Sequence, residues 1–146
     1  MRTFKLTSPA ITIYSGILLV GLSLSSCSKK VNFITSQVVP AAEGYVKISK
    51  DDNKNFTLDV EVKRLAEPSR LKPSKELYLV WMETKSNGVK NLGQLNSSSG
   101  FFSSGLKGLL HAVSPFKPER VFITAEDQAN IPYPGAQLVL TTKTFK

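Results

Sequence analysis

The chain contains a single histidine, His111, and histidine is the side chain most often used for acid–base catalysis and metal binding. A Ser-His-acid site requires a carboxylate that orients the imidazole toward a nucleophile, and the sequence contains no nucleophile-elbow motif. A zinc site requires three or four ligands, and none cluster around this histidine in the sequence. We therefore predict that His111 is a partly buried structural residue, that no metal or other cofactor is bound, and that the protein is not an enzyme.

Two adjacent acidic pairs, Asp51-Asp52 and Glu126-Asp127, are further candidates for metal chemistry. Calcium takes six to eight oxygen ligands from a shaped loop, and neither stretch has that pattern. Aspartate side chains more often stabilise turns by accepting hydrogen bonds from nearby backbone. We expect both pairs to stabilise turns, with Glu126 as a candidate to tie down the proline-rich loop 127–136 by a hydrogen bond.

Cys27 is the only cysteine, so it has no disulfide partner within the chain. It follows an uncharged apolar run, 10–24, which itself follows the basic residues Arg2 and Lys5. A basic start, an apolar run and a small-residue exit are typical of a secretory signal peptide. A membrane anchor is the alternative, but a spanning helix needs about 20 apolar residues, which is more than this run supplies.

The apolar run ends in four residues that include the cysteine: Leu24, Ser25, Ser26 and Cys27. Together they resemble the lipobox of bacterial lipoproteins, in which the cysteine thiol receives a diacylglyceryl group and becomes the new N-terminus. The resemblance implies that fatty acyl chains such as palmitate hold Cys27 on a membrane, and two or more chains do so stably. Ser28 implies the outer membrane, facing the periplasm, because an aspartate at this position often favours inner-membrane retention. An incidental thiol behind an ordinary cleaved signal is the alternative.

The signal peptide is thus assigned to 1–26, and the rest divides into two parts. We predict that 27–42 is a flexible tether, because it begins polar and basic and contains Pro40 and two alanines. Extended, its residues would reach about 50 Å. The remainder, 43–146, has the length of one domain.

The formal net charge of the whole chain is +8, which raises the question of an anionic partner. The basic residues are dispersed and no nucleic-acid recognition motif occurs, so we expect no nucleic-acid partner. The densest basic stretch, 63–75, is interrupted by Pro68 and Pro73 and is interpreted as a solvated loop. Contact with phosphate-rich lipid or wall polymer is the alternative for this stretch.

Alternation of apolar and polar side chains, with almost no helical period, dominates 43–146. It predicts strands at 44–49, 56–63, 77–82, 89–95, 120–124 and 137–142. The stretch 96–108 is a loop or a weak edge strand, and 109–116 is a short helix or a strand. Six or seven short strands predict an all-β protein that forms an antiparallel β-sandwich.

Turn residues predict how two pairs of these strands connect. Asp51 to Lys54 and the Asn-Gly pair at 87–88 are expected to close hairpins. The strand 77–82 is apolar on both faces and is expected at the centre of a sheet. Gly93 is a candidate bulge in the following strand.

Three aromatic residues are candidates for contact with a ligand or a partner. Trp81 lies in the apolar strand 77–82 and is interpreted as part of the core, with stacking on a sugar ring as the alternative. Phe101 and Phe102 lie in a glycine- and serine-rich stretch and are the candidate partner contacts. Their alternative role is to cap an open end of the sandwich.

Three stretches of the sequence, YLVWMETKSNGVKNLGQL, ERVFITAED and IPYPGAQLVLTT, together resemble the extracytoplasmic C-terminal domain of anti-sigma-K factors. The matching positions, within about 43–142, are Tyr78, Trp81, Leu92, Gly93, Thr124, Glu126, Pro134 and Gly135. The resemblance implies a β-sandwich that serves as a sensor-like or interaction domain. A complete anti-sigma factor also has a cytoplasmic domain that binds the sigma factor. Only nine residues precede the apolar run here, so we expect that this chain does not itself sequester a sigma factor.

These patterns together predict a non-catalytic lipoprotein of the bacterial cell envelope. Its partners are expected to be the membrane, through the N-terminal lipid, and another envelope protein, which the β-sandwich binds, with a role in envelope signalling. A carbohydrate- or cell-wall-binding module is the alternative function.

Overall fold

The computed structural model describes residues 27–99 and 105–146. Within these residues the chain forms nine strands and one short 3-10 turn, and no α-helix is present among them. The elements in chain order are β1 (Lys29–Asn32), β2 (Glu43–Lys50), β3 (Phe56–Leu65), η1 (Pro68–Arg70), β4 (Leu77–Thr84), β5 (Gly88–Gln94), β6 (Asn96–Ser99), β7 (Leu106–Ser114), β8 (Pro118–Glu126) and β9 (Leu138–Thr141). No helix in this part of the chain is long and apolar enough to span a bilayer.

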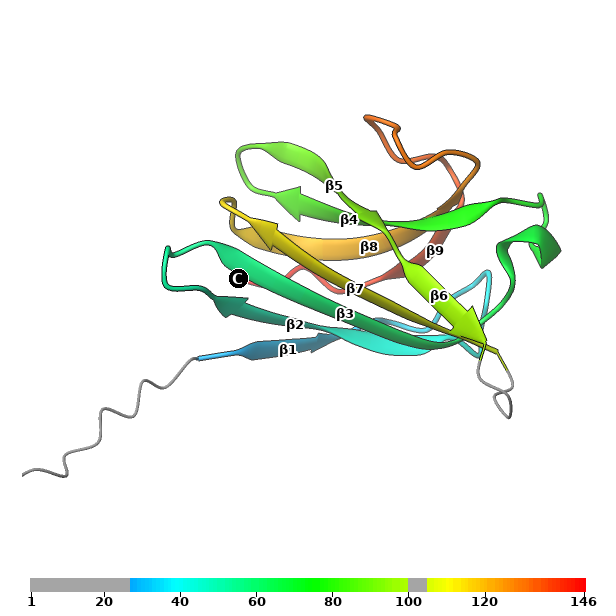
Figure 1. Ribbon diagram of the computed structural model, residues 1–146, viewed down its shortest axis with the longest axis horizontal. Coiled ribbons are helices and arrows are strands. Elements are labelled where there is room, and N and C mark those ends of the chain that lie inside the picture. The colour runs from blue at the N-terminus through cyan, green and yellow to red at the C-terminus, as the bar shows by residue number, and fades with distance from the viewer. Residues whose placement is uncertain (1–26, 100–104) are drawn as a thin grey trace, which may run out of the picture.

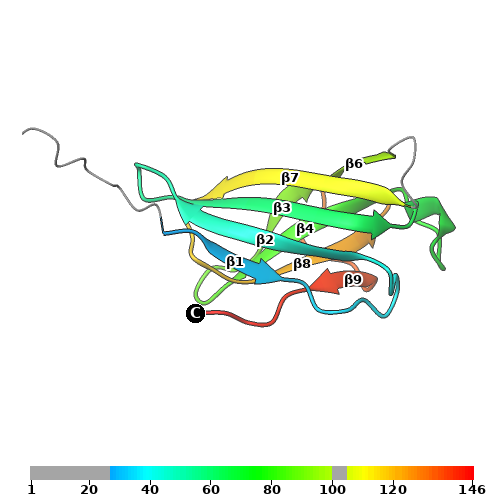
Figure 2. The same cartoon turned by 90° about the horizontal axis from the view of Figure 1, so that it is seen from below.

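The strands form two antiparallel sheets that pack against each other (Figure 1). One sheet has five strands in the order β1-β2-β3-β7-β6, and the other has four in the order β5-β4-β8-β9. The view from below shows the five-stranded sheet running along the length of the molecule (Figure 2). The predicted all-β antiparallel β-sandwich is therefore confirmed, although it has more strands than the six or seven expected.

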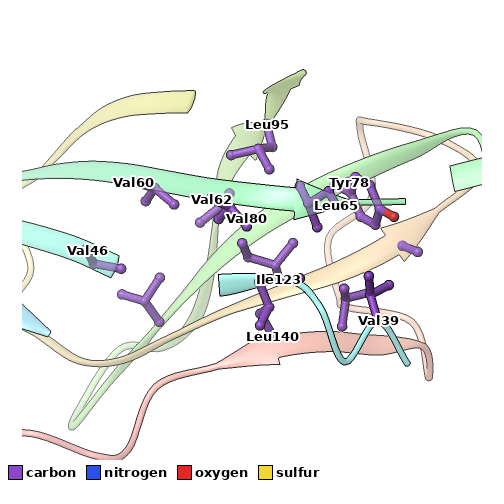
Figure 3. Packing of buried hydrophobic residues seen from close by; sticks show 14 of the residues in the cluster. Val39, Val46, Val60, Val62, Leu65, Tyr78, Val80, Leu95, Ile123 and Leu140 are labelled. Carbon is purple, nitrogen blue, oxygen red and sulfur yellow. The ribbon is translucent and has the colours of Figure 1, made fainter. Parts of the chain in front are cut away.

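The core lies between the two sheets and is built from the alternate, inward side chains of both. Figure 3 shows buried residues of the five-stranded sheet facing buried residues of β4, β8 and β9. The facing residues include Val46, Val60, Val62 and Leu65 on one side and Tyr78, Val80, Ile123 and Leu140 on the other. All strands and core residues that the structure describes lie within 29–142, so a chain that begins at Cys27 contains all of them.

Both predicted hairpins are present. The turn between β2 and β3 is stabilised by Asp51, whose Oδ1 accepts a hydrogen bond from the backbone N–H of Asn55 at 2.8 Å. In the turn between β4 and β5, Gly88 has a φ of 67°, a left-handed conformation that glycine adopts without steric cost. Gly93 has a φ of 119° where the register between β4 and β5 shifts, so the predicted bulge is also confirmed.

The strand β4 lies at the centre of its sheet, between β5 and β8, as its two apolar faces predicted. Tyr78, Val80 and Met82 point into the main core. Trp81 points to the opposite face, where it is fully buried and packs with Leu79 and Phe122. The interpretation of Trp81 as a core residue is therefore confirmed.

The prediction of a flexible tether over 27–42 is wrong for most of that range. Residues Lys29–Asn32 form β1, which pairs with β2, and the N–H of Ile34 donates to the carbonyl of Thr141 at 2.9 Å. Val39 and Ala42 are buried in the core. The folded domain therefore begins at β1 rather than at 43, and the proline and small residues mark the loop between β1 and β2.

The two ambiguous stretches are resolved as strands. Residues Asn96–Ser99 form the edge strand β6, and the stretch 109–116 belongs largely to β7 rather than to a helix. The basic stretch 63–75 is only partly a solvated loop, because β3 extends to Leu65 and because Pro68 and Leu71 are buried beneath the exposed charges. Apolar residues within that stretch thus fix its backbone to the core.

Candidate functional site

A chain of three hydrogen bonds, two of them buried, joins β4 and β8 to the loop 127–137. The indole Nε1–H of Trp81 donates to Thr124 Oγ1 at 2.8 Å, and the hydroxyl of Thr124 donates to Glu126 Oε1 at 2.6 Å. The same carboxylate oxygen accepts the backbone N–H of Gly135 at 2.7 Å. The prediction that Glu126 ties down the proline-rich loop is therefore confirmed.

Gly135 allows this loop to lie directly on the carboxylate. A Cβ atom at this position would lie 2.6 Å from Glu126 Oε2, which is closer than real Cβ atoms approach. The amide of Asn91 adds further support, because its Nδ2 donates to the carbonyls of Ala129 and Ile131 at 3.1 and 3.2 Å. The side chains of Ala129 and Ile131 then pack on the cluster that contains Trp81.

The residues that carry the resemblance to the anti-sigma-K domain thus gather largely around one loop. Trp81, Thr124, Glu126 and Gly135 form one network, and Tyr78 holds the other face of β4 by donating its hydroxyl to the carbonyl of Ala66 at 2.8 Å. Burial, with a smaller contribution from the charge of Glu67, raises the pKa of Tyr78 to about 12. These contacts stabilise the fold, and they bury the side chains of Tyr78, Trp81, Thr124 and Glu126.

The outer face of the five-stranded sheet has a different character. Its three central strands align outward side chains in rows across the sheet. The rows are Tyr45, Glu61 and Leu109; Lys47, Asp59 and His111; and Ser49, Thr57 and Val113. Leu109 is 46% exposed and Val113 is 53% exposed, so the β7 side of these rows is open to solvent.

The first row is organised around the carboxylate of Glu61. Its Oε2 accepts a hydrogen bond from the hydroxyl of Tyr45 at 3.0 Å, and its Oε1 lies 3.3 Å from the amine of Lys63 and 3.6 Å from that of Lys107. The hydrogen bond from Tyr45, with help from the lysines, lowers the pKa of Glu61. The same bond and the nearby negative charge raise the pKa of Tyr45. The amine of Lys30 covers the ring of Tyr45 at 3.7 Å from the centroid.

The second row contains the only histidine. His111 Nδ1 lies 2.6 Å from Asp59 Oδ1, and the imidazole side chain is 65% exposed, so the prediction of partial burial is wrong. The imidazole makes no other hydrogen bond to the described part of the chain, and thus no hydroxyl or thiol there is held as a nucleophile. Among the same residues, no group of three His, Cys, Asp or Glu side chains is placed to bind a metal.

Two shallow hollows meet at Tyr45 and Glu61 on this face. One, of about 370 Å³, extends toward Asn32 and Phe33, and the other, of about 280 Å³, extends toward Leu109 and His111. Their volumes lie near the lower end of the range of about 300–1,000 Å³ for small-molecule sites, and neither hollow is enclosed. The outer face is thus a shallow surface of apolar side chains and paired polar groups, which suits contact with another macromolecule.

The site residues that the sequence predicts lie elsewhere. Cys27 is exposed and stands two positions before β1. The lipobox residues Leu24, Ser25 and Ser26 and the candidate contacts Phe101 and Phe102 lie outside the described residues. Trp81 is buried and offers no ring face to a sugar.

Sequence reasoning missed the rows of the five-stranded sheet. The signal that could have found them is the pair Leu109 and Val113, which are apolar at the outward positions of β7. Because the sequence of 109–116 is compatible with both a helix and a strand, it does not determine whether the two side chains point toward the core or toward solvent. Asp59 and His111 are 52 positions apart, and only the pairing of β3 with β7 brings them together.

Comparison of the chain with models of known protein families, with curated proteins and with solved structures finds no match. The resemblance to the anti-sigma-K domain therefore stays a prediction. The functional conclusion rests on the sequence of the N-terminal segment and on the geometry of the outer face.

Proposed function

We propose that this protein is a non-catalytic lipoprotein of the bacterial cell envelope, anchored through Cys27, whose sandwich binds another protein. The contact surface in this proposal is the outer face of the five-stranded sheet. The observation that carries it is the exposure of Leu109 and Val113 on the same face of β7, with the polar residue His111 between them. Single exposed apolar side chains are common, but two on one open strand face favour a contact surface.

The surroundings of these residues fit the composition of a protein interface. Interfaces combine apolar contacts with a polar rim and are enriched in tyrosine. Here the apolar pair is bordered by the Asp59–His111 pair and by the Tyr45–Glu61 hydrogen bond, and these polar groups already satisfy one another. A partner can therefore cover them without leaving a buried charge unpaired.

At Trp81 and on the outer face of the five-stranded sheet, the structure gives the carbohydrate alternative less support. Its stacking candidate, Trp81, is buried, and one face of the Tyr45 ring is covered by the amine of Lys30. A flat sugar-binding platform needs an accessible aromatic face. The described part of the outer face offers apolar aliphatic side chains instead, which favours a protein partner.

The envelope location is supported by the N-terminal sequence. The basic start, the apolar run 10–24 and Cys27 together favour export and lipidation. The exposure of Cys27 just before β1 leaves its thiol accessible for attachment of a lipid. A role in envelope signalling rests on the resemblance to the anti-sigma-K domain alone.

Co-purification from bacterial membranes tests the proposal. The full chain is expressed in the bacterium, isolated in mild detergent, and its bound proteins are quantified by mass spectrometry. We expect one dominant partner, which Leu109→Ser reduces at least tenfold because the substitution removes the centre of the apolar contact. Leu138→Ser is the matched control, since Leu138 is also a strand leucine and is 41% exposed.

The outcome is interpretable only if the variants remain folded, so thermal unfolding of each is measured alongside. Equal capture by the wild-type chain and Leu109→Ser, with both folded, would refute the contact surface. Cys27→Ser in the same experiment tests the anchor separately. We expect that variant to leave the membrane fraction, and its retention there would refute lipid anchoring through this cysteine.

A further inference from the structure

One end of the sandwich, which we call the Cys27 end, gathers loops from both sheets. It comprises residues 27–29, 50–55, 85–87, 115–117 and 142–146. The strand pairings place them together, because Lys29 pairs next to the end of β2 and Thr84 pairs with Pro118. The start of β1 and the C-terminus lie at this same end in both views (Figure 1, Figure 2).

The Cys27 end carries an excess of unpaired positive charge. Besides the C-terminal residue Lys146, its exposed lysines are Lys29, Lys50, Lys54, Lys85, Lys117 and Lys143, against the acidic residues Asp51 and Asp52 and the nearby Glu119. The amine of Lys29 donates to the main-chain oxygen of Lys146 at 2.7 Å. None of the other five lysines forms an ion pair with a carboxylate in the part of the chain that the structure describes.

The opposite end of the sandwich differs in this respect. There, Arg64 is paired with Glu43, and Lys75 is paired with Asp127 at 2.7 Å. Glu67 and Glu76 further balance Arg70 and Lys72 in the same loop region. The positive charge of the domain is therefore concentrated at the end from which Cys27 emerges.

Three phenylalanines at the Cys27 end or next to it in the sequence each lie beneath a lysine amine. Lys29 is 5.2 Å from the ring centroid of Phe145, and Lys50 is 5.1 Å from that of Phe56. Lys90 likewise lies 5.4 Å from the ring of Phe116. Each ring is partly buried, so this end presents amines above apolar ring surface. Such a combination suits the bilayer boundary, where phosphates lie outside and acyl chains lie below.

The position of Cys27 fixes how close this end can come to a bilayer. Only Ser28 separates Cys27 from β1, and one residue spans about 3.5 Å. A lipid on Cys27 would thus bring the lysines to the headgroup layer, well within the screening length of about 8 Å at physiological salt. A longer tether would have allowed the domain to rotate freely away from the surface.

We propose that the Cys27 end is a second membrane-binding element, which docks on anionic phospholipid through its unpaired lysines and fixes the orientation of the sandwich. This inference goes beyond the proposed function and rests on it only for the presence of a lipid at Cys27. The docked end places the long axis of the strands away from the bilayer, and the outer face of the five-stranded sheet stays accessible to a protein.

Vesicle co-sedimentation tests this proposal without the lipid. The protein is the chain 27–146 with Cys27→Ser, which contains all the strands and core residues that the structure describes. We expect it to bind vesicles of phosphatidylglycerol mixed with phosphatidylcholine and not vesicles of phosphatidylcholine alone, with binding lost at high salt. The triple variant Lys54→Gln, Lys85→Gln, Lys117→Gln should lower the partition constant by about 100-fold, since each lysine near an anionic surface contributes several-fold.

The control variant removes the same charge from the opposite end. Arg64→Gln, Arg70→Gln, Lys72→Gln should change the partition constant only a few-fold, although its net charge is identical. Equal losses in the two triple variants, no binding to the anionic vesicles, or tighter binding to soluble polyphosphate than to the vesicles would each overturn the proposal. Because this protein carries no lipid, the result does not depend on whether Cys27 is modified in cells.

Discussion

Replacement of Glu126 by alanine should destabilise the domain strongly, because this side chain joins the loop 127–137 to β8. Its Oε1 accepts hydrogen bonds from the Thr124 hydroxyl and from the Gly135 N–H, and the residue is only 6% exposed. Alanine removes both bonds at once. It also leaves the Thr124 hydroxyl, in a residue that is 1% exposed, without its acceptor.

The expected magnitude follows from these two bonds. A hydrogen bond to a charged group contributes about 1.5–3 kcal/mol, and a buried donor that loses its partner costs a similar amount. Gly135 is exposed and its N–H can bind water instead, so its bond contributes little to the total. We therefore expect Glu126→Ala to lower the free energy of unfolding by about 3 kcal/mol.

Glu126→Gln is the matched variant, because it keeps the shape of the side chain and one acceptor oxygen. It should cost only about 1 kcal/mol, which is the difference between a charged and a neutral acceptor. Urea unfolding measures both losses of free energy, provided that the variants and the wild type show the same dependence of that free energy on urea concentration. The double variant Glu126→Ala, Thr124→Val should lose less free energy of unfolding than the two single variants lose together, because each change breaks the same bond. The difference should be at least about 1 kcal/mol.

Two results would contradict this role of Glu126: a smaller loss of stability for Glu126→Ala than for Glu126→Gln, or additive losses in the double variant. Either result would mean that the carboxylate does not hold the loop. Both variants, while folded, should still bind the protein partner, since the network lies away from Leu109 and Val113. Loss of the partner without loss of stability would instead assign Glu126 to the contact surface.

Three further predictions concern the anchor, the pH response and the sheet. Intact-mass and fragment analysis of the membrane-derived protein should find Cys27 as the first residue with a diacylglyceryl group, and an unmodified thiol there would exclude the lipoprotein assignment. Tyr78 has a folded pKa of about 12, above the unfolded value of 10, so its stabilising contribution is present below pH 10 and is lost as the pH rises toward 12. Stability curves at alkaline pH should therefore fall less steeply for Tyr78→Phe than for the wild type, and identical slopes would contradict the buried phenol. Gly44→Ala should unfold the domain or lower its free energy of unfolding by about 3 kcal/mol, because the new Cβ would clash with the backbone oxygen of Glu61. Calorimetry measures this loss. A loss of less than about 1 kcal/mol would show that β2 and β3 can separate at this position.

Local sequence signals were sufficient for the hairpins and for the central strand. Asp51 and Gly88 act within their own turns, and the two apolar faces of β4 are visible in the sequence. These features depend on residues only a few positions apart. The sandwich class followed from counting such strands, which explains why it could be predicted without any knowledge of the pairing order.

The edge strand β1 could not be predicted in the same way. It has only four residues, two of them lysines, and its partner β2 begins eleven positions later. Lysine on an edge strand protects the sheet from further pairing, so a polar and basic segment is compatible with such a strand. The sequence pattern of a tether and that of a short protected edge are therefore alike.

The candidate surface depends on long-range register, which no local pattern gives. His111 stands among apolar neighbours in the sequence, but alternation along β7 sends Leu109, His111 and Val113 outward together. The same limit applies to the bond between Trp81 and Thr124, which are 43 positions apart. Only the pairing of β4 with β8 reveals that the residues of the motif support one another.

Site-specific photo-crosslinking in living bacteria tests the central claim most directly. A light-activated amino acid replaces Leu109 in one strain and Leu138 in another, and the adducts are identified by mass spectrometry. The account predicts one dominant protein adduct from position 109, in the membrane fraction, and none of that species from position 138. Adducts of equal yield from both positions, or glycan adducts and no protein from position 109, would contradict it.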